Sequence, residues 1–297
     1  MKTKRNKFKS GLLGVAVFAF CLLPSHWVEA AQARALVWQK SNVTSQCKDP
    51  DGDGVELPDT YSEDVGNDWL DVMENAWGTI TFDNGIWAEE LTDNGSCTWG
   101  KDHTDANLDD GDATLLATHG GAFPTADPDY FLASLSNNYG NHGSSTCGSR
   151  GTNMTLGNDD AEFVHSTACH SCEWNLIVDH TDVMHYRLHQ FGGFHGEYWS
   201  NGNSRIDDFA EEGFTSASSL RWAWIENETI WDIHGSDDNC ALSMVQGISS
   251  SDTTARSNYE DYDPGQYSDP SGQTVIKFYY YCGCDPSGTN SVPLPCN

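Results

Sequence analysis

Two short apolar runs, each ending in a reactive residue, constrain the fold of this chain more than any other feature. The first run, at 113–118, leads into His119 and Gly120. The second, at 163–168, leads into Cys169. Such runs are typical of parallel strands buried under helices, and catalytic residues collect at the carboxyl ends of these strands. We therefore expect His119 and Cys169 at one edge of a single sheet.

The residues at these two ends suit thiol chemistry. A cysteine nucleophile needs a nearby imidazole to take or stabilise its proton. Small neighbouring residues let backbone N–H groups approach an oxyanion as it develops. His119 supplies the imidazole, and Gly120, Gly121 and Ala168 are the small neighbours. The pattern predicts Cys169 as a nucleophile with His119 as its partner.

In these motifs the chain resembles the caspase-like cysteine peptidases, which include caspases, legumain, clostripain and gingipains. Their pattern is a strand followed by His-Gly and then a strand followed by Ala-Cys. The separation of 50 residues between His119 and Cys169 matches that of caspases. The segment 167–171, Thr-Ala-Cys-His-Ser, departs from the caspase motif and is closer to the Ala-Cys-x-Ser of legumain-like members. The resemblance covers 112–200, and caspase specificity does not carry over.

The resemblance implies an α/β fold of three layers, with a mostly parallel sheet flanked by helices. It also implies a cysteine peptidase, a hydrolase that acts on protein or peptide substrates and needs no cofactor for its chemistry. Cys169 would attack a peptide carbonyl while His119 handles the protons. The backbone N–H groups of Gly120 and Cys169 would bind the oxyanion.

Residues 1–33 have the features of a secretory signal peptide. Basic residues precede an apolar stretch at 12–23, and small residues follow at 30–33. The apolar stretch is shorter than the roughly 20 residues of a membrane-spanning helix. We expect a secreted protein that is free of the membrane once the signal is removed. Residues 34–297 then form a single caspase-like domain with a Cys-rich C-terminal segment.

The charge of the chain excludes some partners. The net charge is −29, and without the leader ten basic residues face 43 acidic ones, which gives −33. Nucleic acids and anionic membranes are poor partners for such a protein. The same acidity favours a carboxylate in the substrate pocket, hence cleavage after Arg or Lys. Clostripain-like and gingipain-like relatives share that preference.

The cysteine count predicts a free thiol. Nine of the ten cysteines follow the leader, and in an oxidising compartment eight of nine can pair. Cys169 is the expected unpaired residue. Cys172 forms a C-x-x-C motif with Cys169, a pattern also used in redox and zinc sites. A disulfide between these two cysteines remains an alternative.

An acidic segment is a candidate calcium site. It matches the first half of an EF-hand loop, with oxygen ligands at alternate positions and Gly at the sixth. The twelfth position is Thr60 rather than Glu, and Asp59 can substitute for it. A plain acidic turn is the alternative to a structural calcium ion. The candidate ligands are Asp49, Asp51, Asp53 and Asp59.

Histidines also gather around Cys169 in the sequence. A helix would place His185 and His189 on one side, where zinc could bind. The metalloprotease signature needs Glu beside the first His, and Tyr186 stands there instead. The rivals of the peptidase are thus a metal-dependent hydrolase and a non-catalytic secreted binding module. The histidines are His165, His170, His180, His185, His189 and His195.

Periodicity predicts the remaining elements. Strands and helices alternate, which is typical of a parallel sheet with helices on both faces. The predicted strands are 35–38, 192–199 and 274–281. The predicted helices are 68–77, a helix that carries Met184, Leu188 and Phe191, and a long helix over 206–224. Residues 249–273, rich in Ser, Asp, Pro and Gly, are predicted as a loop.

Overall fold

The structure is a computed structural model that describes part of the chain. These residues are 31–39, 41, 62–83, 91, 110–120, 154–158, 160–174, 181–184, 187–199, 205–215, 218–235, 237–272, 274–287 and 293–296.

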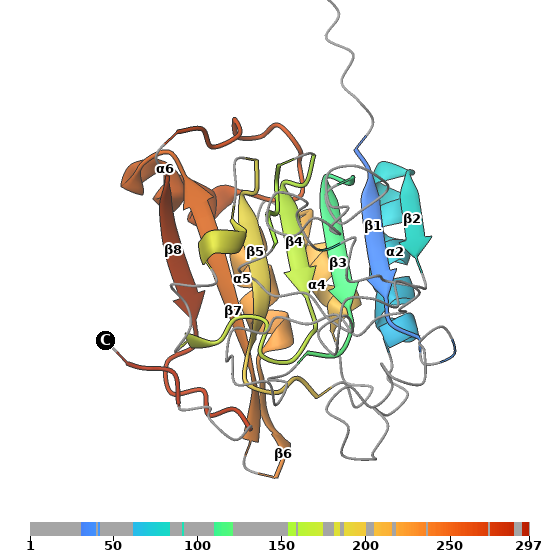
Figure 1. Cartoon of the computed structure of the whole chain (residues 1–297), viewed down its shortest axis with the longest axis vertical. Helices are drawn as coiled ribbons and strands as arrows, with labels where there is room; N and C mark the ends of the chain where they lie inside the picture. Colours follow the sequence, from blue (N-terminus) through green and yellow to red (C-terminus); the bar gives the residue numbers. More distant parts are fainter. Residues whose placement is uncertain are drawn as a thin grey trace, which may run out of the picture.

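The centre of the fold is a mixed sheet of eight strands (Figure 1). The strand order is β2-β1-β3-β4-β5-β7-β6, and β8 also pairs with β7. The strands β2, β1, β3, β4 and β5 are mutually parallel, whereas β7 is antiparallel to β5, β6 and β8. Their bounds are β1 Ala33–Val37, β2 Ile80–Asp83, β3 Ala113–Ala117, β4 Phe163–Ser166, β5 Gln190–His195, β6 Ile230–His234, β7 Asp237–Gly247 and β8 Val275–Tyr280. The chain therefore has an α/β fold with a mostly parallel sheet flanked by helices.

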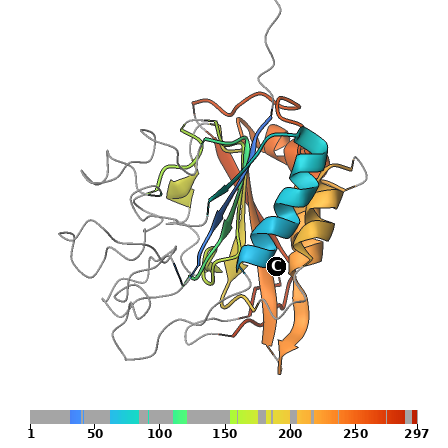
Figure 2. The same ribbon diagram turned by 90° about the vertical axis from the view of Figure 1, so that its right-hand side faces the viewer.

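Three of the helices cover one face of this sheet, as Figure 2 shows. They are α2 (Ser62–Trp77), α4 (Ile206–Gly213) and α5 (Leu220–Glu228). A fourth helix, α6 (Ser250–Tyr259), packs against α5 and β7. The short 3-10 helix η5 (Thr181–Val183) lies on the opposite face. No helix in the described ranges combines the length and the apolar character needed to cross a membrane.

The apolar runs of the sequence arise because both faces of the sheet are buried. In β1, Ala35 and Val37 face the helices, and Leu36 faces the other side. The helix-side core includes Trp69 and Trp224, both fully buried. A parallel sheet that is covered on both faces needs apolar side chains at successive positions, which is the pattern in the sequence.

One predicted helix is wrong. Met184 follows η5 and forms an isolated bridge with Leu156, while Phe191 lies in β5. Met184, Leu188 and Phe191 nevertheless belong to the same core cluster. Their spacing reflects common burial of a folded-back segment rather than a helical repeat.

Other predictions need smaller corrections. The predicted long helix is two helices, because the chain turns after Gly213, where a Cβ atom would lie 2.6 Å from the Tyr262 ring. The predicted loop at 249–273 begins with α6, whose cap Ser249 accepts a hydrogen bond from the Asp252 N–H. The strands near 35–38 and 274–281 and the helix near 68–77 are confirmed. The strand expected at 192–199 is β5, shifted toward the N-terminus.

Glu228, the last residue of α5, is an unusual buried carboxyl. It is fully buried, and neither carboxyl oxygen has a hydrogen-bond partner among the described residues. Burial raises its pKa from 4.5 to about 8; Arg205 opposes the shift and Asp207 adds to it. The folded protein therefore keeps a proton that the unfolded chain releases at lower pH.

This carboxyl makes stability fall as pH rises. Its contribution is fully present below about pH 4.5 and is lost as pH rises through the folded pKa, with a slope of about 1.4 kcal/mol per pH unit between the two pKa values. We predict that Glu228→Gln is more stable than wild type at pH 8 and similar to it at pH 5. Urea unfolding at both pH values measures this difference. Glu226→Gln, at an exposed position of the same helix, is the control, and equal responses of the two variants would contradict the prediction.

Candidate active site

His119 and Cys169 follow neighbouring parallel strands, as the sequence predicts. The register of β3 and β4 begins with Ala113 opposite Phe163. His119 comes two residues after the end of β3, and Cys169 comes three residues after the end of β4. Both residues therefore lie at the carboxyl edge of the sheet, the edge toward which the arrows of β3 and β4 point in Figure 1.

Gly120 is in direct backbone contact with Cys169. A Cβ atom at position 120 would lie 1.9 Å from the carbonyl oxygen of Cys169 and 2.8 Å from its nitrogen. Only glycine allows backbone segments to approach this closely. The His119-Gly120 motif and the Cys169 motif, far apart in sequence, therefore meet in space.

The Cys169 thiol contacts backbone groups of Tyr198 and Gly120. Its Sγ accepts a hydrogen bond from the Tyr198 N–H at 3.3 Å and lies 3.7 Å from the Tyr198 carbonyl oxygen. Burial raises the pKa of this thiol; the backbone N–H groups of Tyr198 and Gly120 oppose the shift, and the charge of Glu197 adds to it. Cys169 is therefore a neutral thiol at neutral pH, and its attack on a carbonyl requires a base.

The imidazole of His119 packs against Trp38. The ring centroids are 4.6 Å apart, with the planes nearly perpendicular. Trp38 directly follows β1, and its N–H donates to the carbonyl of Ala117 in β3 at 2.8 Å. Three adjacent strands thus contribute Trp38, His119 and Cys169 to the same edge, and Trp38 restricts the orientation of the imidazole.

Glu173 is a site residue that the sequence analysis missed. Its carboxylate bonds to Nδ1 of His170, and its Oε2 lies 2.8 Å from Nδ1 of His195. It also accepts a hydrogen bond from the Gly196 N–H at 3.1 Å. Glu173 thereby ties the turn after Cys169 to the segment that encloses the thiol. The sequence gives one hint of this role: Glu173 stands three positions after His170, the residue that follows Cys169.

This arrangement holds an ionised carboxylate beside the cysteine turn. Burial alone would raise the pKa of Glu173, but the hydrogen bonds and charges of His170 and His195 outweigh burial and lower it. His170 has a φ of +57°, a left-handed conformation that is uncommon for a residue other than glycine. The bond to Glu173 helps to keep this turn in place, directly after the thiol.

Comparison with known proteins gave no relative. The chain matches no protein-family model, no curated protein and no solved structure. The function must therefore be argued from the geometry of the site.

Cys172 corrects the expectation of a single free thiol. Both Cys169 and Cys172 are free among the described cysteines, and they do not form a disulfide with each other. Cys172 is fully buried, and burial raises its pKa well above the ordinary value. A neutral, enclosed thiol of this kind is a core residue rather than a redox centre.

The structure does not bring the candidate metal ligands of the sequence together within the described residues. The calcium candidates Asp49, Asp51, Asp53 and Asp59 lie outside the described residues, as do His180 and His185. His165 is fully buried against the rings of Phe209 and Trp224, and burial lowers its pKa to about 3. His170 and His195 bind Glu173, whereas His189 precedes β5 at the opposite end of the sheet. The described histidines therefore do not form one metal centre.

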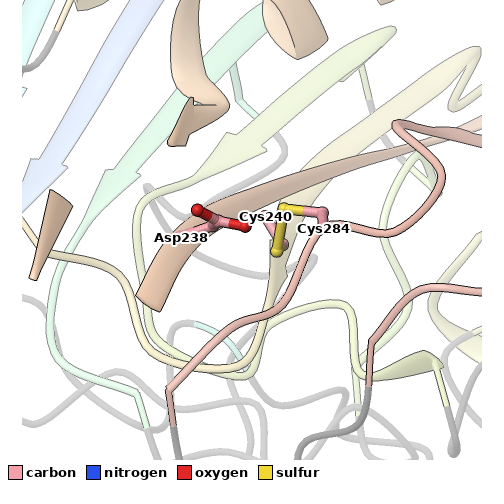
Figure 3. Close-up of side chains that lie close together, drawn as sticks. All are labelled: Asp238, Cys240 and Cys284. Atoms are coloured by element: carbon pink, nitrogen blue, oxygen red, sulfur yellow. A yellow bond between two sulfur atoms is a disulfide. The ribbon is translucent and has the colours of Figure 1, made fainter. Parts of the chain in front are cut away.

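A group formed by Asp238, Cys240 and Cys284 also has the composition of a metal site (Figure 3). The two sulfur atoms are joined in a disulfide, so no thiolate is available as a ligand. The Asp238 carboxylate accepts hydrogen bonds from the N–H groups of Asp232 and Asp285. This group is structural, and a second disulfide joins Cys282 and Cys296 nearby in the sequence.

The two free thiols differ in access, which predicts different reactivity. In native, unreduced protein we expect iodoacetamide to modify Cys169, which is partly exposed, and to spare Cys172 until the protein unfolds. Because burial raises the pKa of the Cys169 thiol above its ordinary value, its labelling rate should still rise with pH where an ordinary thiol is already ionised. Peptide mapping by mass spectrometry reads both sites. Equal labelling of both cysteines, or a rate that levels off below about pH 8, would contradict this assignment.

Proposed function

We propose that this protein is a secreted cysteine peptidase of caspase-like architecture, with Cys169 and His119 as its catalytic dyad. The observation that carries the proposal is the backbone contact between Gly120 and Cys169. It joins the two motifs of the resemblance at one edge of a mostly parallel sheet. The partial exposure of Cys169 adds support, because a nucleophile must be within reach of its substrate.

Acylation begins when Sγ of Cys169 attacks the carbonyl carbon of a peptide bond. The thiol proton passes to the imidazole of His119, and the carbonyl oxygen becomes an oxyanion. Backbone N–H groups of Gly120 and Cys169 stabilise this oxyanion. The imidazolium then gives its proton to the leaving amine, the C–N bond breaks, and a thioester on Cys169 remains.

Deacylation uses the same groups. His119 takes a proton from a water molecule, whose oxygen attacks the thioester carbonyl. The tetrahedral intermediate collapses, the C–S bond breaks and the proton returns to Cys169, which releases the acid product. Glu173 does not touch the reacting atoms in this scheme; it positions the turn that carries Cys169. The chemistry requires no cofactor, and the calcium proposed for the segment 49–59 has a structural role.

The dyad proposal is tested with purified mature protein and a positional-scanning peptide library. We predict that Cys169→Ala and His119→Ala each lower kcat/KM by about 10³-fold or more, because a nucleophile and its base act as a unit. Cys172→Ala, the matched control, removes a second free thiol of the described residues and should keep the activity. Gly120→Ala should lose activity through its clash with Cys169. If the wild type cleaves nothing although Cys169 is alkylatable, the non-catalytic binding module replaces the peptidase.

Glu197 supports a preference for basic residues before the scissile bond. It directly precedes Tyr198, the residue whose backbone encloses the thiol, and its Oε2 accepts a hydrogen bond from Ser287 at 2.8 Å. Its charge acts on Cys169, in addition to the larger effect of burial. A fixed carboxylate at this position can attract an Arg or Lys side chain of the substrate.

Substitution of Glu197 should have two effects of opposite direction. In Glu197→Gln we predict about a tenfold lower kcat/KM for Arg and Lys substrates, from the loss of one charge pair. Alkylation of Cys169 at fixed pH should become faster, since a group that raises its pKa is gone. Substrate profiling and labelling kinetics measure the two effects, with Glu226→Gln as the control. Cleavage after Asp or Asn, with Arg and Lys refused, would overturn the preference.

A further inference from the structure

A second polar cluster lies at the amino end of the sheet, opposite the edge that carries Cys169. Glu162 directly precedes β4, and His189 directly precedes β5. Asp269 belongs to the chain between α6 and β8, which runs across the top of the sheet in Figure 1. Three segments that are distant in sequence therefore bring an imidazole and two carboxyl groups together.

The donor atoms of these residues face one another. One ligand atom from each of Glu162, His189 and Asp269 lies within 4.8 Å of the others. His189 is fully buried, and its Nε2 has no hydrogen-bond partner among the described residues; a carboxylate oxygen of Asp269 lies 3.6 Å from it. Oε2 of Glu162 is likewise buried and without a hydrogen-bond partner within the described ranges. Buried polar atoms are rarely left unpaired, and a bound ion would satisfy both.

The other nitrogen of His189 has the partner that metal-binding histidines require. Nδ1 lies 2.7 Å from Oε1 of Glu260, and that oxygen also accepts a hydrogen bond from Arg256 at 3.2 Å. A carboxylate on the second ring nitrogen is typical of zinc-bound histidines, because it sets the tautomer and the ring orientation. With the proton on Nδ1, Nε2 is left with a free lone pair on the atom that faces Asp269.

We propose that Glu162, His189 and Asp269 bind one zinc ion at the amino end of the sheet. Zinc suits one imidazole nitrogen and two carboxylate oxygens, whereas calcium and magnesium prefer sites made of oxygen alone. Asp269 is partly exposed, which gives the ion a way in from solvent. The ion would join the starts of β4 and β5 to the segment after α6, and its role is to stabilise the fold. This site is independent of the proposed peptidase.

The alternative to a zinc site is a cluster of charged side chains in which a protonated His189, and no metal ion, balances the carboxylates. Burial alone would lower the pKa of His189, but the carboxylates of Asp269 and Glu260 outweigh burial and raise it to about 9. Burial raises the pKa of Glu162 to about 7. Arg187 faces Asp269 at 3.5 Å and Arg256 faces Glu260, so two further cations also act on the cluster. The experiment must therefore show zinc on the imidazole and not only near carboxylates.

Zinc binding is measured on the full chain without reductant, so that the two disulfides of the described residues stay closed. The background is Cys169→Ala with Cys172→Ala, which removes the two free thiols of the described residues as alternative ligands. Millimolar calcium is added so that it occupies sites made of oxygen ligands alone and zinc does not bind there. We expect one zinc per chain after gel filtration, by elemental analysis, and a higher melting temperature with zinc chloride. Cobalt in place of zinc should give visible absorption bands that report nitrogen ligation.

Three variants decide the result. His189→Gln should abolish zinc binding and the cobalt bands, and Asp269→Asn should weaken zinc binding by about tenfold or more. Asp160→Asn is the matched control: it removes an exposed carboxylate that pairs with Arg187 but is not in the ligand set. If His189→Gln does not fold, Asp269→Asn decides the result, because the Asp269 side chain is partly exposed and its substitution disturbs the core less. Absence of bound zinc, or equal binding by Asp269→Asn and Asp160→Asn, would overturn the proposal. The catalytic cysteine is absent in this background, so failure here does not bear on the peptidase.

Discussion

The backbone contact between Gly120 and Cys169 is the constraint on which the rest of the candidate site depends. It exists because β3 and β4 pair in parallel, so that both chains leave the sheet at the same edge. No side chain can stand between the two turns, which explains a glycine directly after His119. The same contact brings backbone N–H groups to the thiol, the groups that would stabilise an oxyanion.

How much the sequence could predict depends on how local each feature is. The strands β3 and β4, with His119 and Cys169 after them, could be predicted because a buried strand and its end produce a local pattern in the sequence. The role of Glu173 could not be predicted, since it depends on a contact with His195, which only the folded chain brings close to it. The α6 helix was missed because its composition is polar, although Ser249 caps it; its burial, which includes Arg256, depends on the elements that pack against it. In each case the missing information was a contact between distant segments.

The sheet separates two kinds of polar chemistry. Its carboxyl edge carries a neutral thiol, the imidazole of His119, and a carboxylate that two other histidines hold ionised. At its amino end an imidazole stands among carboxyl groups whose buried atoms lack partners among the described residues. Because the strands of β4 and β5 lie between them, a metal ion at one end would not compete with the nucleophile at the other. The first end suits covalent chemistry and the second suits stabilisation of the fold.

The most direct test of the central claim is an adduct with a substrate-like electrophile. A peptidyl acyloxymethyl ketone with arginine at its reactive end binds as a substrate does, and the nucleophile displaces its carboxylate leaving group. Intact-mass and peptide analysis of the treated protein should show one adduct per chain, on Cys169, and none after unfolding the protein in advance. An adduct on another cysteine, or no adduct on protein whose Cys169 still reacts with iodoacetamide, would contradict the account.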